Sequence, residues 1–145
     1  MIKIPYYETS HFVFSNFSAH QVVYLDVTYP TAEHAFHAQK FVDANVRERI
    51  QQCGSPLDAW QLGTTLKDEQ RPDWNEVKVS VLTDIVRQKA AQHSEVRDAL
   101  IASGGEEIQE VNPHDSFWGS GADGTGQNTT GKILMSIRDE LGQNN

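Results

Sequence analysis

The amino-acid sequence predicts a mainly helical α+β protein, a single domain over residues 1–145 with a few short strands. Several segments carry helix start signals, in which a capping Thr, Ser or Asp lies next to Pro and precedes an acidic residue in the first turn. Only short segments have the β-branched and aromatic composition that favours strands. A chain of 145 residues is long enough to bury one hydrophobic core.

Three short segments are expected to be strands: residues 2–7, 21–28 and 107–111. Between the first two, Phe12–Ser18 places three Phe residues around Ser15 and Asn16. Ser and Asn favour turns, so this segment predicts an aromatic-lined bend. Core packing is expected mainly of Phe12 and Phe17.

The expected helices begin near Thr31, Asp43, Ser55, Asp73 and Ser94, and a last one carries Ile133, Leu134, Ile137 and Leu141. Gly54 is expected to stop the second helix after Cys53. Gly63 is expected to end the third helix, because glycine is a poor helix former.

The composition limits the possible functions. The net charge of −8 gives no footprint for sequence-independent binding to nucleic acid, which needs clustered Lys and Arg. A small nucleotide, or one modified nucleotide within a strand, stays possible. Cys53 is the single cysteine, so no internal disulfide can form and a cytoplasmic location is expected. Neither a signal peptide nor a segment of membrane-spanning length is found.

The segment Tyr29–Phe41 organises the prediction, because its helical spacing gives two unlike faces. One face carries small or apolar residues, namely Ala35, Ala38 and Val42. The other carries an acid, an aromatic ring, an imidazole and an amine, namely Glu33, Phe36, His37 and Lys40. Such a helix predicts the wall of a pocket. The alternative is an exposed face with a Glu–Lys pair.

A second unusual segment is Pro113–Asn128, which holds four of the ten glycines and leads into the final helix. Glycine-rich segments before a helix can bind an anion through backbone N–H groups. The spacing matches neither a P-loop nor a dinucleotide fingerprint. A long glycine turn is the alternative interpretation.

Candidate chemistry follows from these two segments. The carboxylates of Glu33 and Asp115 could stabilise an oxocarbenium-like transition state and handle protons during cleavage of a glycosidic bond. Trp118 could stack on a base or ribose. Lys40, if partly desolvated, could attack an anomeric carbon and open the sugar to a Schiff base, although a surface lysine is the alternative.

Metal and triad chemistry are not expected. His34 and His37 lie three residues apart, but Cys53 has no partner cysteine and no H-E-x-x-H motif occurs. No G-x-S-x-G motif is present either. No cofactor and no metal are therefore predicted.

Several motifs together resemble the NADAR family over nearly the whole chain. They are Phe14-Ser15-Asn16-Phe17, Tyr29-Pro30-Thr31-x-Glu33-His34-x-Phe36, Ala38-Gln39-Lys40-Phe41, Arg71-x-Asp73-Trp74, and Trp118-Gly119-x-Gly121 with Gly126-x-Asn128-x-x-Gly131-Lys132. The resemblance implies a mainly helical α+β domain. It also implies hydrolysis of an N-glycosidic bond, in ADP-ribosylated guanine of nucleic acid or in phosphoribosyl-pyrimidine intermediates of riboflavin synthesis.

Carried over to this sequence, the resemblance implies that Glu33, Lys40 and Asp115 are catalytic. The implied substrate-binding residues are Phe14, Ser15, Asn16, Phe36, His37, Trp118, Gly119, Asp123, Gly126 and Asn128. The sequence departs from the family at His37, where Gln is frequent, at Thr64, where Arg is common, and at Leu82, where Met is usual. The resemblance implies a phosphate contact from that Arg, so its absence bears on which of the two substrates is bound.

The leading hypothesis is a metal-independent N-glycosidase that removes ADP-ribose from guanine in nucleic acid, which the small acidic chain favours. The early helix and the late glycine segment are expected to share one cavity. Alternatives are an N-glycosidase of riboflavin intermediates and a non-catalytic ADP-ribose-binding module. The expected partner is the ribosylated nucleotide or nucleic acid, without a membrane or an obligate protein partner.

Overall fold

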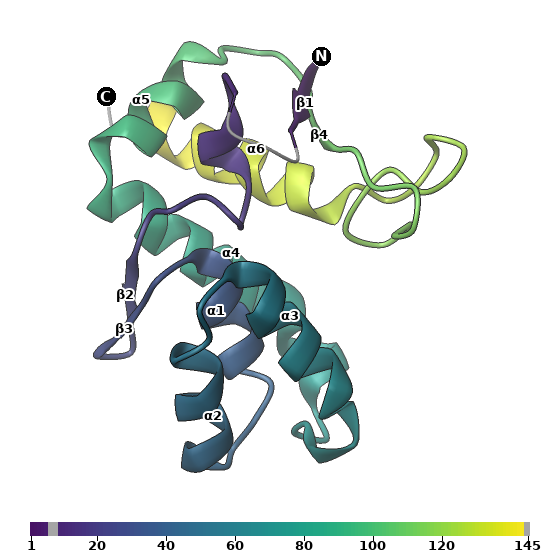
Figure 1. Cartoon of the computed structure of the whole chain (residues 1–145). Coiled ribbons are helices and arrows are strands. Elements are labelled where there is room, and N and C mark those ends of the chain that lie inside the picture. The colour runs from purple at the N-terminus through teal and green to yellow at the C-terminus, as the bar shows by residue number, and fades with distance from the viewer. Residues whose placement is uncertain (6–8, 144–145) are drawn as a thin grey trace. The chain divides into compact units, whose positions relative to one another are not determined.

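The computed structural model describes residues 1–5 and 9–143 and is mainly helical with a few short strands (Figure 1). This confirms the predicted fold class. Two compact units can be distinguished, one of Met1–Ser18 with His93–Asn145 and one of Ala19–Gln92. The single domain boundary at 1–145 stays a prediction.

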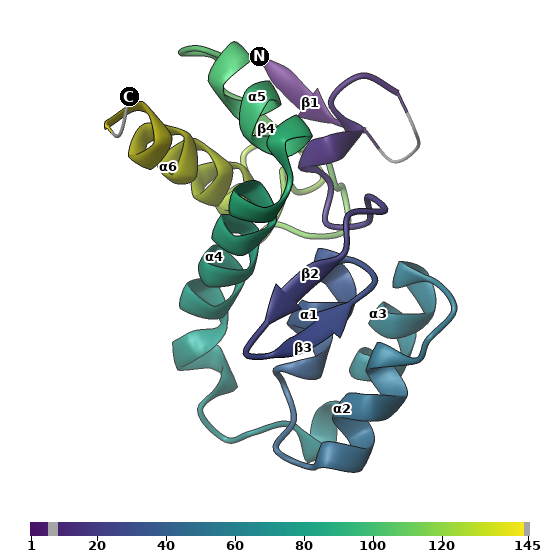
Figure 2. The ribbon, with the colours of Figure 1, turned by 90° about the vertical axis from the view of Figure 1, so that its left-hand side faces the viewer.

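The unit Ala19–Gln92 is built around one short helix, α1 (Ala32–Ala38). Its other elements are β2 (Val22–Tyr24), β3 (Val27–Tyr29), α2 (Ala44–Gln51), α3 (Pro56–Thr65), a 3-10 turn η2 (Lys67–Glu69) and α4 (Trp74–Gln92). Helix α1 contacts α2, α3, α4 and both strands (Figure 2). Its side chains therefore face neighbours on almost every side, and of its seven residues only Glu33 is not fully buried.

The expected strand 21–28 is instead an antiparallel hairpin, in which Val22 pairs with Tyr29 and Tyr24 pairs with Val27. Leu25 and Asp26 form the turn, with φ of 50° and 66°. Positive φ at both central residues gives a two-residue turn that matches strand twist, and Gly or Asn usually supply it. Leu is seldom found there, so the sequence carries no turn signal.

Helix α1 begins as predicted but ends earlier than its apolar spacing suggests. The hydroxyl of Thr31 caps it by accepting the N–H of His34 at 3.2 Å. The helix ends at Ala38, and the chain leaves helical geometry after Gln39. Val42, expected on the apolar face, is consequently 78% exposed, which corrects that prediction.

Helix α3 starts at the predicted cap, Ser55, but continues through Gly63 to Thr65. A Cβ atom on Gly63 would lie 2.6 Å from Nδ1 of His37. Gly63 is therefore a packing residue within the helix and not its end. The expected stop at Gly63 is wrong because tertiary packing, which one sequence does not reveal, explains this glycine.

The unit Met1–Ser18 with His93–Asn145 contains β1 (Ile2–Ile4), η1 (Phe12–Phe14), α5 (Ser94–Ala102), β4 (Ile108–Glu110) and α6 (Thr129–Gln143). Strands β1 and β4 pair in parallel, with Ile2 opposite Ile108. Helix α6, which carries the apolar residues predicted for the last helix, packs on β4 and α5 (Figure 1) and buries Ile133, Leu134 and Ile137. Tyr6 and Tyr7 of the expected first strand lie outside the described residues.

The Phe-rich segment contains a 3-10 turn in place of a simple bend. Phe14 is only 1% exposed and its ring stacks on that of His11, with centroids 5.8 Å apart. Phe12 and Phe17 are only half-buried, so the expectation that these two form the core is corrected. Ser15 supports the following turn by accepting the N–H of Phe17 at 3.1 Å.

Candidate active site

Four predicted residues come together on α1 and the turn after it: Glu33, Phe36, His37 and Lys40, called here the α1 wall. Nε2 of His37 lies 2.7 Å from Oε1 of Glu33, one helical turn apart. These side chains are only 6% and 12% exposed, respectively. An ionised carboxylate only accepts hydrogen bonds, so the imidazole donates to it. The wall thus presents an acid that is held in place and shielded from water.

Lys40 adds a partly buried amine to this acid. Burial lowers the pKa of Lys40, the positive charge of Lys78 lowers it further, and the negative charge of Glu33 acts in the opposite direction. The ammonium nitrogen lies 5.8 Å from the centre of the Phe36 ring. Glu33 and Lys40 are thus within electrostatic range although the sequence separates them by two helical turns. A lowered pKa increases the fraction of neutral, nucleophilic amine.

Aromatic packing fixes the α1 wall against α4. The ring of Phe36 stacks on His37 with centroids 5.5 Å apart and meets the ring of Trp74 at 5.1 Å. Phe36 is 7% exposed and Trp74 is 4% exposed. The backbone N–H of Arg71 donates to the carbonyl of Lys40 at 2.7 Å, which ties the end of the wall to the segment before α4.

His34, on the same helix, has a structural role. Its Nε2 lies 2.9 Å from the carbonyl of Cys53, which can only accept, so this nitrogen carries the hydrogen. Its Nδ1 then accepts from the hydroxyl of Thr31 at 2.8 Å. The Cys53 thiol donates to the carbonyl of Arg49, and burial raises its pKa, so it is not an activated nucleophile. Within the described residues, no three His, Cys, Asp or Glu side chains group as metal ligands would.

The glycine segment after β4 uses its polar side chains to hold its own backbone. Oδ1 of Asp115 accepts the N–H groups of Phe117 at 2.9 Å and Trp118 at 2.8 Å. Oδ1 of Asp123 accepts both the N–H and the hydroxyl of Thr125, and these bonds lower the pKa of Asp123. Each carboxylate thus stabilises a local turn.

Asn128 fastens this segment to β4. Its Oδ1 accepts the N–H of Glu110 at 2.9 Å, and its Nδ2 donates to the carbonyl of Ile108 at 2.8 Å. Its φ is 53°, in a region that Asn tolerates better than most residues. A Cβ on Gly131, one turn later, would collide with Ile108 and Asn128. Both ends of the Asn128 amide are therefore engaged within the protein.

Many backbone amides of the segment are also engaged internally. Their acceptors lie within the same segment: Gly126 N donates to Ser120 O at 2.6 Å, Gln127 N to Ser116 O at 2.7 Å, and Asn128 N to Gly119 O at 3.0 Å. A Cβ on Gly119 or Gly126 would meet neighbouring backbone, so these glycines permit close crossing of the chain. A predicted phosphate contact at this loop must therefore come from other groups than these three amides.

The predicted site residues therefore fall in two places. The α1 wall lies in the unit Ala19–Gln92, whereas Phe14, Ser15 and Asn16 and the glycine segment from Asp115 to Asn128 lie in the other unit. Sequence reasoning missed Gly63 and Trp74 as partners of the wall. The position of Gly63 within a helix-favouring segment could have indicated that another residue packs closely against it. The Asp73-Trp74 motif could likewise have indicated Trp74.

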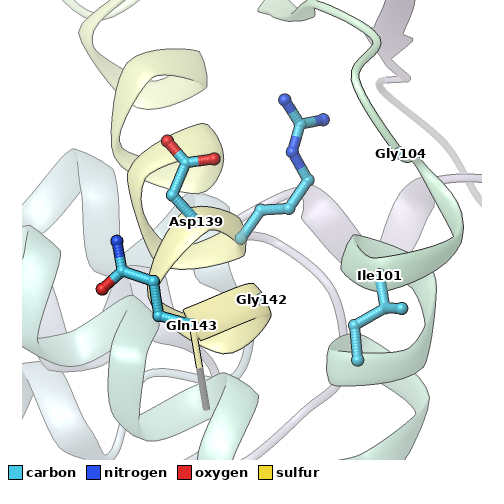
Figure 3. A pocket seen from close by; sticks show the side chains of 6 residues that line it. Ile101, Gly104, Asp139, Gly142 and Gln143 are labelled. Carbon is cyan, nitrogen blue, oxygen red and sulfur yellow. The ribbon is translucent and has the colours of Figure 1, made fainter. Parts of the chain in front are cut away.

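A pocket of about 450 Å³ lies elsewhere, between the ends of α5 and α6 (Figure 3). Its lining residues are Ile101, Gly104, Arg138, Asp139, Gly142 and Gln143. The Arg138 guanidinium donates to the Ser103 hydroxyl at 3.0 Å and to the Glu106 carbonyl at 2.7 Å, so it holds the chain that follows α5. None of the predicted catalytic residues lines this pocket.

Comparisons with known proteins identify the class. The NADAR domain model matches residues 4–142. N-glycosidase YbiA of Escherichia coli is 38% identical over 140 residues, which cover 95% of this chain and 88% of that protein. N-glycosidase Npun_R5314 of Nostoc punctiforme is 40% identical over 131 residues, which cover 88% of this chain and 84% of that protein. The chain belongs to the NADAR family.

A solved structure and a longer relative agree with this assignment. The NMR structure of Escherichia coli YbiA matches with a TM-score of 0.87 and 35% identity, over 99% of this chain and 86% of that one. Riboflavin biosynthesis protein VVA0006 of Vibrio vulnificus is 35% identical over 95% of this chain, but only 38% of that protein is covered. The predicted enzyme class, an N-glycosidase of this family, is confirmed. None of the described helices is long and apolar enough to cross a membrane.

Proposed function

We propose that this enzyme hydrolyses the N-glycosidic bond between a ribosyl group and a nucleobase, and that its substrate is ADP-ribosylated guanine in nucleic acid. The observation that carries the proposal is the α1 wall, where a shielded acid and an amine of lowered pKa occupy one short helix and its end. Relatives that match over most of their own length are named N-glycosidases, which supports the type of bond.

Glu33 would act at the anomeric carbon. Cleavage of the glycosidic bond leaves positive charge on the sugar, and a carboxylate in a water-poor site stabilises that charge more strongly than it would in water. The hydrogen bond from His37 leaves the second oxygen of Glu33 to face the sugar.

Lys40 would be the nucleophile. Its neutral amine attacks the anomeric carbon, the base leaves with the electron pair of the broken bond and takes up a proton, and the sugar ring opens to an imine on Nζ. Water then adds to the imine carbon, which frees the ribosyl product and restores the amine. This route needs a lysine that loses its proton more readily than an exposed one.

The remaining predicted residues would bind the substrate. Asp115 would use Oδ2 to orient a sugar hydroxyl or the water, since its Oδ1 already accepts two amides. Trp118 would stack on the base or ribose. Its ring is half-buried and meets the Phe117 ring edge-on at 4.8 Å.

A second candidate substrate is a phosphoribosyl-pyrimidine intermediate of riboflavin synthesis. The names of the Vibrio vulnificus relative and of riboflavin biosynthesis protein PYRR from Zea mays favour it. The matches to this chain span only 38% and 23% of the length of those two proteins, so their names support this candidate less strongly.

The deciding experiment incubates the enzyme with ADP-ribosylated guanine oligonucleotide and, separately, with the phosphoribosyl-pyrimidine intermediates. Chromatography measures free ADP-ribose and unmodified oligonucleotide from the first substrate, and free pyrimidine base from the second. Release of ADP-ribose that leaves the guanine in the oligonucleotide supports the leading proposal, whereas turnover of the pyrimidine intermediates alone favours the second candidate. Tight binding of ADP-ribose with no turnover of either substrate would instead indicate a non-catalytic binding module.

A further inference from the structure

The two ring nitrogens of His37 have unlike surroundings. Nε2 donates to Glu33 at 2.7 Å. Nδ1 is buried and has no hydrogen-bond partner within the described part of the chain. The backbone of Gly63 on α3 lies against it, so close that a Cβ there would be 2.6 Å from Nδ1 and 3.0 Å from Cγ. One nitrogen thus acts on the acid and the other faces a packed surface.

These surroundings select one form of the ring. A hydrogen on Nδ1 would be a buried donor without an acceptor, which is among the costlier defects in a protein interior. A bare lone pair on Nδ1 avoids that cost and places the single ring hydrogen on Nε2, toward Glu33. Stacking on Phe36 with an interplanar angle of 21° further restricts rotation of the ring.

We propose that His37 is a positioning residue that fixes the carboxylate of Glu33 through Nε2–H, and that Gly63 is the surface that keeps the imidazole in place. This inference rests on the proposed function of Glu33. It differs from the predicted role of His37 in binding the substrate, because neither nitrogen is left for a ligand. It also explains a glycine inside α3, where Ala would be the better helix former.

Two substitutions of His37 separate positioning from simple packing. In His37→Gln the amide nitrogen lies as many bonds from Cβ as Nε2 does, so it can donate to Glu33. In His37→Asn the amide lies one bond nearer, in the place of Nδ1, and cannot reach Glu33. We expect Asn to lower kcat about 100-fold with little change in KM, because small displacements of a reacting group are costly. Gln should recover most of that loss. Equal kcat for the two variants would overturn the proposal.

A matched pair of glycine substitutions tests the role of Gly63. Gly63→Ala adds a methyl group that the His37 ring must avoid, whereas Gly54→Ala adds the same group where nothing lies within 4 Å. We expect about a tenfold lower kcat for Gly63→Ala, in line with a small displacement of the acid, and no change for Gly54→Ala. A Gly63→Ala enzyme with the kcat of the unmodified protein would contradict the proposal.

A measurement without substrate keeps this inference separate from the proposed function. Nitrogen-15 NMR of the imidazole rings should show hydrogen on Nε2 and none on Nδ1 of His37. Glu33→Ala should shift the Nε2–H signal of His37 but not that of His34, which donates to Cys53. Hydrogen on Nδ1 of His37, or an unshifted signal, would overturn the inference. Absence of turnover on every substrate would overturn the proposed function. The NMR measurement would still decide the role of His37, because it needs no substrate.

Discussion

The α1 wall and the glycine segment after β4 were both predicted to form the site, but the fold uses their polar groups differently. In the wall, Glu33 is shielded and receives one hydrogen bond, and burial lowers the pKa of Lys40. In the glycine segment, the side-chain oxygens of Asp115 and Asn128 accept backbone N–H groups. The glycine segment thus uses these polar groups to hold its own backbone, whereas the carboxylate of Glu33 is held by the side chain of His37.

Residue type and motif alone therefore do not decide which role a carboxylate has in the fold. Glu33 and Asp115 were both predicted to be catalytic carboxylates on the strength of their sequence context. Oδ1 of Asp115 is the capping atom of a turn, whereas Oε1 of Glu33 meets a ring N–H of another side chain in a buried site.

The largest expected effect is on turnover at the α1 wall. Glu33→Gln and Lys40→Ala should each lower kcat by about 1,000-fold, because each removes a group that acts on the reacting carbon. Glu48→Gln and Lys67→Ala, at exposed positions, are matched controls that should keep full turnover. Circular dichroism should show that all four variants fold. Unchanged turnover in both wall variants would show that the catalytic assignments are wrong.

The next largest effect is on stability at the glycine segment. Asn128→Ala leaves the N–H of Glu110 and the carbonyl of Ile108 without their partner. We expect the free energy of unfolding in urea to fall by about 2–3 kcal/mol, whereas Gln127→Ala, at an exposed position, should change it little. If Asn128→Ala kept full stability but lost substrate affinity, Asn128 would be a direct ligand contact instead.

A smaller effect is expected at Asp115. Asp115→Ala frees two backbone amides, much as loss of a helix cap does, and should lower the free energy of unfolding by about 1 kcal/mol. Asp115→Asn keeps an oxygen that can accept both amides and should be destabilised less. Chemical denaturation compares the two variants. An Asp115→Ala protein with unchanged stability would contradict the structural role.

The smallest effect is a pH-dependent change in stability at Lys40. Because the pKa of Lys40 is lowered in the folded state, the unfolded chain binds its proton more readily and folding bears a penalty. This penalty is complete below the lowered pKa and disappears as the pH rises to the ordinary value of 10.5. Lys40→Met should therefore be more stable at neutral pH, by less than about 1 kcal/mol because water screens a half-buried charge.

Urea titrations at several pH values measure this difference. The advantage of Lys40→Met should shrink as the pH approaches 10.5. Lys67→Met, at an exposed position, should show no such trend. An advantage that grows with pH would mean that burial does not disfavour the charge on Lys40.

Local signals predicted much of the fold. The caps Thr31, Asp43 and Ser55 start their helices as expected, because a capping side chain and its N–H lie within one turn of chain. The hairpin at Leu25 and Asp26 was missed, since neither residue signals a positive φ. The helical spacing identified the wall residues but could not decide between a pocket wall and an exposed face, and their catalytic and binding roles were implied by the family resemblance.

The contacts that shape the site were not predictable, because they join residues far apart in the sequence. Gly63 was assigned to the end of a helix, but its lack of a side chain serves the His37 ring. The packing of Trp74 on Phe36 joins residues of α4 and α1. The internal bonds of Asp115 and Asn128 likewise depend on the folded path of the loop.

The most direct test of the covalent route through Lys40 is borohydride trapping during turnover of ADP-ribosylated guanine oligonucleotide, followed by mass spectrometry of the digested protein. This route predicts a reduced adduct that retains the ribosyl group, has lost the base, and is attached to Nζ of Lys40. Rapid turnover with no adduct on Lys40, or an adduct on another residue, would contradict it.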